Sequence, residues 1–185
     1  ARRFVASWLA LVLLLSGLTI AGLVRVFGAS QAVTSADGGT YTEGMIGNFT
    51  NLNPLFGAGV LDDSASRLIF NGLFRYDSNG EFVPDLAKEL KVAEDRKTYT
   101  ITLRSGVTWH DGTQFTAEDV AYTVGIIQNP ETRSPLFSSW QGIKVTAVND
   151  QEVSFELPAP FAPFPNALTL SILPEHLLKD IPANR

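Results

Sequence analysis

The chain has 185 residues, of which 45% are hydrophobic and 18% charged, a composition that suits one compact domain with or without an appendage. Three of the 14 basic residues lie in the first 30 positions, and none of the 19 acidic residues does. The rest of the chain therefore carries 11 basic and 19 acidic groups, a net charge of −8. So acidic a body is unsuited to binding nucleic acid through a basic surface. The lack of cysteine excludes disulfides, thiolate nucleophiles and Cys-ligated metals.

The chain opens with a long apolar run. Residues 4–24 contain no charge, and roughly 20 apolar residues span the ~30 Å core of a bilayer. Because Arg2 and Arg3 precede the run, the positive-inside rule predicts a cytoplasmic N-terminus and an extracytoplasmic body. We therefore predict a transmembrane anchor or uncleaved signal over residues 1–28. A cleaved signal peptide, cut near residues 30–32, is the alternative.

The next stretch is loop-rich. Residues 29–40 are small and polar, which predicts a flexible tether, and residues 40–49 favour a short strand. Residues 51–60 hold a proline and two glycines and are predicted to be a loop. Asp62 or Asp63 can then cap a helix. The apolar residues predicted to lie on one face of that helix are Ala65, Leu68, Ile69 and Leu73.

Strand patterns dominate the middle of the chain. Residues 77–80 read Asp-Ser-Asn-Gly, a strong turn signal, and residues 84–90 favour about two helical turns. Residues 98–104 alternate between apolar and polar side chains, as in a half-buried antiparallel strand. Residues 143–149 and 152–157 alternate in the same way and predict a hairpin.

Two more helices complete an α+β pattern. The first covers residues 117–128, where Thr116 and Asp119 are spaced as in a capping box, with Asp in place of the usual Glu. The second begins near Pro174.

The pair His110-Asp111 is the best candidate for catalysis or metal binding. Adjacent residues on a strand point to opposite faces, and no G-x-S-x-G motif supplies a nucleophile, so the sequence favours a tight turn before the helix at 117. His110 and His176 are 66 residues apart and lack the spacing of a metal motif. We predict no catalytic residue, metal site or cofactor. A metal-dependent envelope hydrolase using these residues remains an alternative.

The order of motifs resembles a known family. Leu86-Ala87, residues 98–113 and residues 116–120 together resemble the signature of bacterial extracellular solute-binding proteins of family 5, the peptide, dipeptide and nickel receptors of ABC importers. Residues 52–54 (Leu-Asn-Pro) resemble the family's Leu-Asp-Pro, with Asn in place of Asp. Shorter matches are Asn71-Gly72-Leu73 and Leu173-Pro174-Glu175-His176, and the resemblance covers about residues 40–181. The stretch Leu15-Ser16-Gly17-Leu18 resembles a lipobox without its cysteine.

The resemblance implies a two-lobed periplasmic-binding-protein fold of type II, with an α/β sheet in each lobe. Residues 41–61 correspond to the first strand and cleft edge of lobe I, and residues 62–181 to its α+β subdomain. The rest of lobe I and all of lobe II have no counterpart in this chain. We therefore expect an N-terminal fragment of such a receptor.

Ligand contacts are also implied by the resemblance. In peptide-binding members, an extended stretch after Leu-Asp-Pro pairs with the ligand backbone, and here it corresponds to Ala58, Gly59, Val60 and Leu61. A second contact follows a Ser-Pro pair, which corresponds to Leu136 and Phe137. The expected function is capture of oligopeptides or dipeptides outside the cytoplasm, and the expected partners are an ABC permease and its ATPase. Binding of nickel or another small solute, or an adhesion module, are the alternatives.

Overall fold

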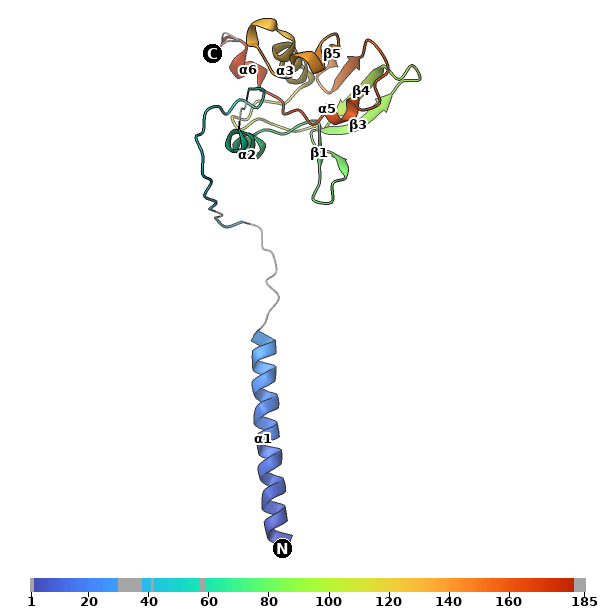
Figure 1. Cartoon of the computed structure of the whole chain (residues 1–185). Coiled ribbons are helices and arrows are strands. Elements are labelled where there is room, and N and C mark those ends of the chain that lie inside the picture. Colours follow the sequence, from blue (N-terminus) through green and yellow to red (C-terminus); the bar gives the residue numbers. More distant parts are fainter. Residues whose placement is uncertain (1, 30–37, 41, 57–58, 182–185) are drawn as a thin grey trace. The chain divides into compact units, whose positions relative to one another are not determined.

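The computed structural model describes residues 2–29, 38–40, 42–56 and 59–181. The chain divides into two compact units, Ala1–Gly44 and Met45–Arg185. The first contains a single 28-residue helix, α1 (Arg2–Ala29) (Figure 1).

The predicted transmembrane anchor is not supported. A membrane span needs about 20 consecutive apolar residues. Within the described residues, no helix is both long enough and apolar enough to cross a membrane. The tether at 29–40 falls mostly outside the described residues.

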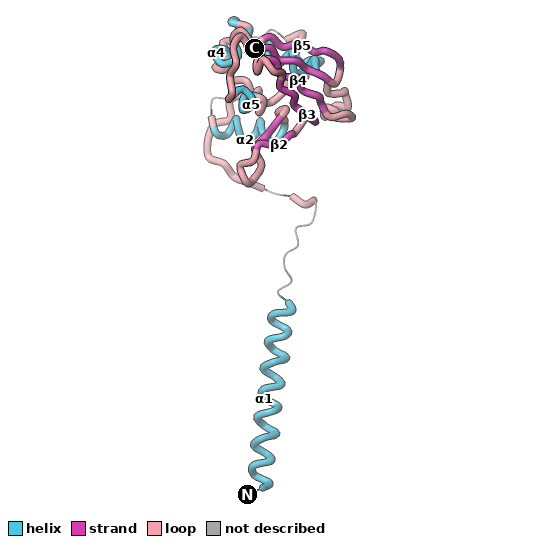
Figure 2. The backbone as a smooth tube through the Cα atoms, turned by 90° about the vertical axis from the view of Figure 1, so that its right-hand side faces the viewer, coloured by secondary structure: helices cyan, strands magenta, loops and turns pink. Residues whose placement is uncertain are grey.

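The second unit is built on a four-stranded antiparallel sheet with the order β3-β4-β6-β5 (Figure 2). Its strands are β3 (Ala87–Val92), β4 (Thr98–Leu103), β5 (Lys144–Asn149) and β6 (Glu152–Glu156). In the register between the central strands, Tyr99 is opposite Phe155 and Ile101 is opposite Val153, and these four side chains are buried. The sequence predictions of a strand at 98–104 and a hairpin at 143–157 are confirmed.

Helix α3 (Ala117–Gln128) packs against β5 and β6 and buries Val120, Val124 and Ile127. Its capping box is present as predicted: the Thr116 side chain accepts from the Asp119 N–H, and the Asp119 carboxylate accepts from the Thr116 N–H. Aromatic rings fill the rest of the core. The ring of Phe164 lies 5.7 Å from Phe155 and 6.0 Å from Trp140, centroid to centroid. The capped helix and the sheet therefore share one core.

A second, smaller hairpin joins β1 (Phe74–Tyr76) to β2 (Phe82–Pro84). Asp77 closes its turn by accepting hydrogen bonds from the N–H groups of Asn79 and Glu81, which confirms the turn predicted there. The helix predicted at 84–90 is wrong. The backbone of residues 85–87 donates to Gly72 and Leu73, and β3 then pairs with β4, so tertiary pairing overrides helix propensity.

The strand predicted at 40–49 is also absent from the described part of that segment, residues 40 and 42–49. A β-strand is stabilised by hydrogen bonds to a neighbouring strand. None of the described strands pairs with this segment, and the side chains of Met45, Ile46 and Phe49 are exposed.

Helix α2 (Val60–Ile69) was predicted, but its start and its buried face differ from the prediction. Gly59 is the N-cap, and Asp62 lies in the first turn, where its buried carboxylate accepts from the N–H and the hydroxyl of Thr50. Ser66 is also buried and donates to the Leu52 carbonyl at 2.9 Å. Leu68, expected on the buried face, is 88% exposed. The polar face of α2 therefore packs inward.

Short helical turns connect these elements. They are η1 (Pro130–Thr132), α4 (Phe137–Trp140), α5 (Phe164–Ala167) and α6 (Glu175–Leu178). The last one confirms the helix predicted after Pro174.

Candidate functional site

The four residues expected to pair with a ligand lie at the start of α2. Ala58 is outside the described residues. Gly59 is exposed and extended, with φ −153° and ψ 164°, whereas Val60 and Leu61 already belong to the helix. The extended backbone expected at 58–61 is therefore found only at Gly59 among the described residues. The reason is that the helix begins two residues before the predicted caps.

Leu136 and Phe137 lie on a different element. Both are half-buried at the start of α4, directly after Ser134-Pro135. Their loop is held by Gln128 at the end of α3, whose side-chain amide donates to the carbonyls of Trp140 at 2.7 Å and Ile143 at 2.6 Å. This loop thus has a defined position, but no described contact joins it to Gly59.

A pocket of about 460 Å³ lies beside α2. None of the predicted ligand-binding residues lines it. Its walls come from α2, from the segment between α2 and β1, and from the loop after α5. The lining residues are Pro54, Asp63, Ser66, Arg67, Phe70, Asn71, Gly72, Phe74, Arg75, Tyr76, Asp85, Thr169, Leu170 and Ser171.

The pocket has mixed charge. Asp85 accepts a hydrogen bond from the Asn71 side chain at 2.8 Å and lies 3.9 Å from Nε of Arg75. Arg67 and Asp63 bring a second pair of opposite charges from α2. Such a wall offers donors and acceptors to a polar or zwitterionic group. The sequence does not predict this pocket, although the motif Asn71-Gly72 is part of its lining.

Gly72 shows why glycine stands in that motif. It forms a β-bridge with Ser171, and an added Cβ would lie 2.8 Å from the carbonyl oxygen of Thr169. A side chain there would push the two backbone segments apart. Gly72 therefore allows the segment before β1 to lie close to residues 169–171.

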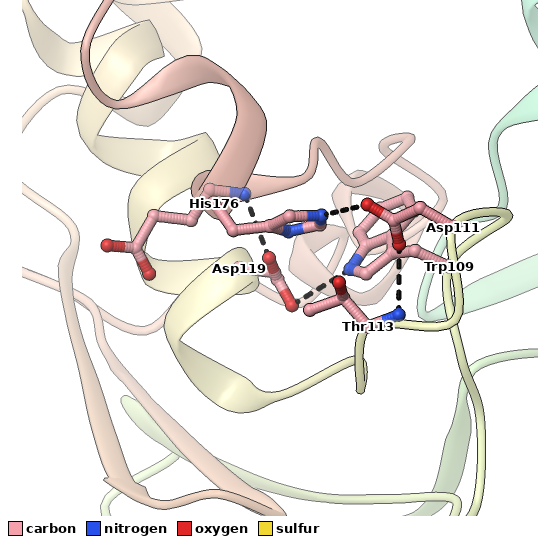
Figure 3. A network of polar contacts seen from close by, with 6 residues as sticks. Trp109, Asp111, Thr113, Asp119 and His176 are labelled. Atoms are coloured by element: carbon pink, nitrogen blue, oxygen red, sulfur yellow. Dashed lines mark hydrogen bonds and ion pairs between the residues drawn. The ribbon is translucent and has the colours of Figure 1, made fainter.

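No described side-chain contact joins His110 to Asp111. The turn is closed by the Trp109 N–H to the Thr113 carbonyl at 2.8 Å, with Gly112 at φ 88°. Asp111 contacts His176, not His110: Oδ2 of Asp111 lies 2.7 Å from Nε2 of His176 (Figure 3). The Thr113 N–H, followed by His176, lowers the pKa of Asp111 to about 2.

Asp119 ties the same turn to the C-terminal segment. One of its carboxylate oxygens accepts from the indole N–H of Trp109 at 3.2 Å and the other from the Glu175 N–H at 2.9 Å (Figure 3). Within the described residues, no group of His, Asp or Glu side chains could hold a metal ion. The arrangement is a structural network, and His110 makes no described side-chain hydrogen bond or ion pair in it.

Comparison with known proteins agrees with this fold. The model of "Bacterial extracellular solute-binding proteins, family 5 Middle" matches residues 81–182, just over half of the chain. The chain belongs to this family of solute-binding proteins. The resemblance inferred from the motifs is thereby confirmed.

Individual relatives extend the match. The glutathione-binding protein GsiB of Pectobacterium atrosepticum is 30% identical over 157 residues, covering 84% of this chain and 29% of the relative. Protein XP55 of Streptomyces lividans is 37% identical over 148 residues, covering 76% of this chain and 27% of the relative. The chain thus spans less than a third of the curated relatives it matches.

Solved structures give the same result. NikZ from Campylobacter jejuni, in complex with Ni(L-His), superposes with a TM-score of 0.69 at 34% identity, covering 75% of this chain and 28% of that one. The oligopeptide-binding protein AppA from Bacillus subtilis, with a nonapeptide, gives 0.69 at 27% identity, covering 76% and 28%. These are binding proteins of the type II periplasmic fold, not enzymes, and this chain has part of that fold.

Proposed function

We propose that this chain is part of the substrate-binding component of an ABC importer, and that its receptor captures oligopeptides outside the cytoplasm. The observation that carries the proposal is the match of its second unit to AppA, which was solved with a nonapeptide. A permease and its ATPase would receive the ligand after the two lobes close around it.

Backbone pairing is the proposed mode of peptide capture. Gly59 is extended and exposed, so a peptide main chain can approach it and exchange N–H and C=O contacts. The first N–H groups of α2, at Val60 and Leu61, lack intrahelical acceptors and can donate to ligand oxygens. Leu136 and Phe137 would add apolar contacts. Ala58 is included in the proposed contact by its place in the sequence.

A small polar solute is the second candidate. NikZ, solved with Ni(L-His), is 34% identical to this chain, against 27% for AppA, and GsiB is named for glutathione. The 460 Å³ pocket with charges of both signs suits a small zwitterion. This candidate predicts selectivity for amino-acid-sized ligands over long peptides.

A chimera separates the two candidates. Residues 45–181 of this chain would replace the matching segment of AppA, and binding of the nonapeptide, of glutathione and of a nickel–histidine complex would be measured by calorimetry. The peptide proposal expects nonapeptide binding within roughly tenfold of AppA, about 1.4 kcal/mol. Loss of nonapeptide binding together with gain of either small ligand would favour the second candidate.

Gly59 provides the site-specific test in the same chimera. A Cβ at Gly59 would meet no other described atom within 4 Å, so Gly59→Ala is accommodated while its methyl group obstructs the approach of a ligand backbone. We expect nonapeptide affinity to fall by at least about tenfold. Gly125→Ala, which also adds a Cβ in open space, is the matched control. Equal affinities for the two variants would contradict backbone pairing at Gly59.

A further inference from the structure

His176 and Asp111 lie 65 residues apart in the sequence but are in contact in the structure. Nε2 of His176 is 2.7 Å from Oδ2 of Asp111, with the side chains 27% and 40% exposed, respectively. The imidazole also faces the ring of Trp109, with centroids 6.4 Å apart. The contact is thus fixed on one side by an aromatic ring and remains accessible to solvent protons.

We propose that His176 and Asp111 form a proton-controlled clasp, which fastens residues 174–181 to the turn at 109–113 while the imidazole is charged and loosens when the imidazole becomes neutral. The inference is independent of the ligand and of the proposed function.

The segment that the clasp holds is short and only partly buried. Helix α6 has four residues, none of them fully buried, and so short a helix is not stable by itself. Leu178 of this helix packs against the core. Two backbone bonds anchor its start: the Leu173 N–H to Oγ1 of Thr123, and the Glu175 N–H to Asp119, both at 2.9 Å. Beyond Glu175, the His176 side chain is the described polar contact that reaches across to the 109–113 turn (Figure 3).

Asp111 is the partner of the clasp that stays charged. Asp111 accepts from the Thr113 N–H as well as from His176, and its lowered pKa of about 2 keeps it ionised throughout the range in which histidines titrate. Its contribution to stability is present above the ordinary Asp pKa and is lost as the pH falls through about 2. An ion pair with Asp111 requires a charged imidazole, whereas a neutral imidazole leaves at most a hydrogen bond.

The other charged groups around the ring do not replace Asp111. From α3, the Asp119 carboxylate is occupied by Trp109, Thr116 and Glu175. Burial, followed by the charge of Glu175, raises the pKa of Tyr122 on α3. Lys179, directly after α6, is exposed, as is His110 in the turn.

A double-mutant cycle at two pH values tests the clasp in the 185-residue chain. The variants are Asp111→Asn, which keeps the acceptor for the Thr113 N–H, His176→Gln, which keeps a side-chain donor, and the two combined. We expect the coupling, as a ratio of unfolding equilibrium constants, to be roughly two- to fivefold at about pH 5.5 and to approach one at about pH 8.5. A cycle with His110→Gln in place of His176→Gln should show no coupling at either pH.

Amide hydrogen exchange at residues 176–181 gives a second readout. After correction for intrinsic rates, protection in the unaltered chain should decrease between the two pH values, while His176→Gln should show the lower protection at both. Coupling that is equal at the two pH values, or the same pH-dependent protection in His176→Gln, would overturn the proposal.

Discussion

The sheet and helix α2 place their apolar side chains in opposite environments. In the sheet, Ile101 and Leu103 lie on one face of β4 and are buried against the core. In α2, Leu68 and Val60 are exposed, while the buried positions of the helix are Asp62 and Ser66.

The difference shows what an apolar spacing can and cannot specify. On β4, both neighbouring strands and the aromatic core are present in the same compact unit, so the alternating face is buried. At α2, hydrogen bonds from Thr50 to Asp62 and from Ser66 to Leu52 determine which face of the helix packs inward. Local polar contacts therefore override the apolar pattern of α2.

The same substitution in the two regions gives the sharpest contrast. Leu103→Ala removes a side chain that is 2% exposed, and it should lower the free energy of unfolding by about 2–5 kcal/mol. Leu68→Ala should change it by no more than about 0.5 kcal/mol, because Leu68 is mostly in solvent. Urea titration of both variants measures the difference. Similar losses in both would show that Leu68 is covered in solution.

A polar pair within α2 tests which face is inward. Asp62→Ala removes two hydrogen bonds that Thr50 donates to a buried carboxylate and should destabilise the chain by about 1–3 kcal/mol. Asp63→Ala, the next residue and exposed, should cost no more than about 0.5 kcal/mol. Thermal unfolding of the two variants under identical conditions is the measurement, and the reverse order would mean that α2 packs with its other face.

Two substitutions at helix α3 should change the free energy of unfolding by smaller amounts, one lowering it and one raising it. Thr116→Ala removes half of the capping box and should destabilise by about 1 kcal/mol. Gly125→Ala, at an exposed helical position with open space around the new Cβ, should stabilise by about 0.5–1 kcal/mol. Circular dichroism during urea unfolding resolves both changes. A neutral Thr116→Ala would mean that Asp119 alone maintains the start of α3.

Much of the sheet region was predictable because its signals are local and agree with each other. The alternation at 98–104 and the box Thr116–Asp119 each specify an element without distant information. The local sequence of residues 84–90 favours a helix. Their actual conformation depends on pairing with β4 and with residues 72–73, which the local sequence does not reveal. The strand predicted at 40–49 lacks a described partner strand, which no local pattern can supply.

The candidate site was less predictable for the same reason. The resemblance placed Gly59 and Leu136 by sequence order, but the pocket beside α2 is formed when residues 169–171 approach Gly72. The contact between Asp111 and His176 likewise joins two turns 65 residues apart. Contacts of this kind follow from the tertiary structure, and residue spacing does not reveal them.

The outer strands of the sheet have a consequence for behaviour at high concentration. Both β3 and β5 have an irregular register, at Ala87/Glu89 and at Ala147/Asn149, and exposed lysines lie on both, such as Lys91 and Lys144. To add a strand from another molecule, either edge would have to straighten and bring ammonium groups close to a second backbone. Fibril growth by edge-to-edge stacking is thereby disfavoured at the sheet, however concentrated the protein becomes.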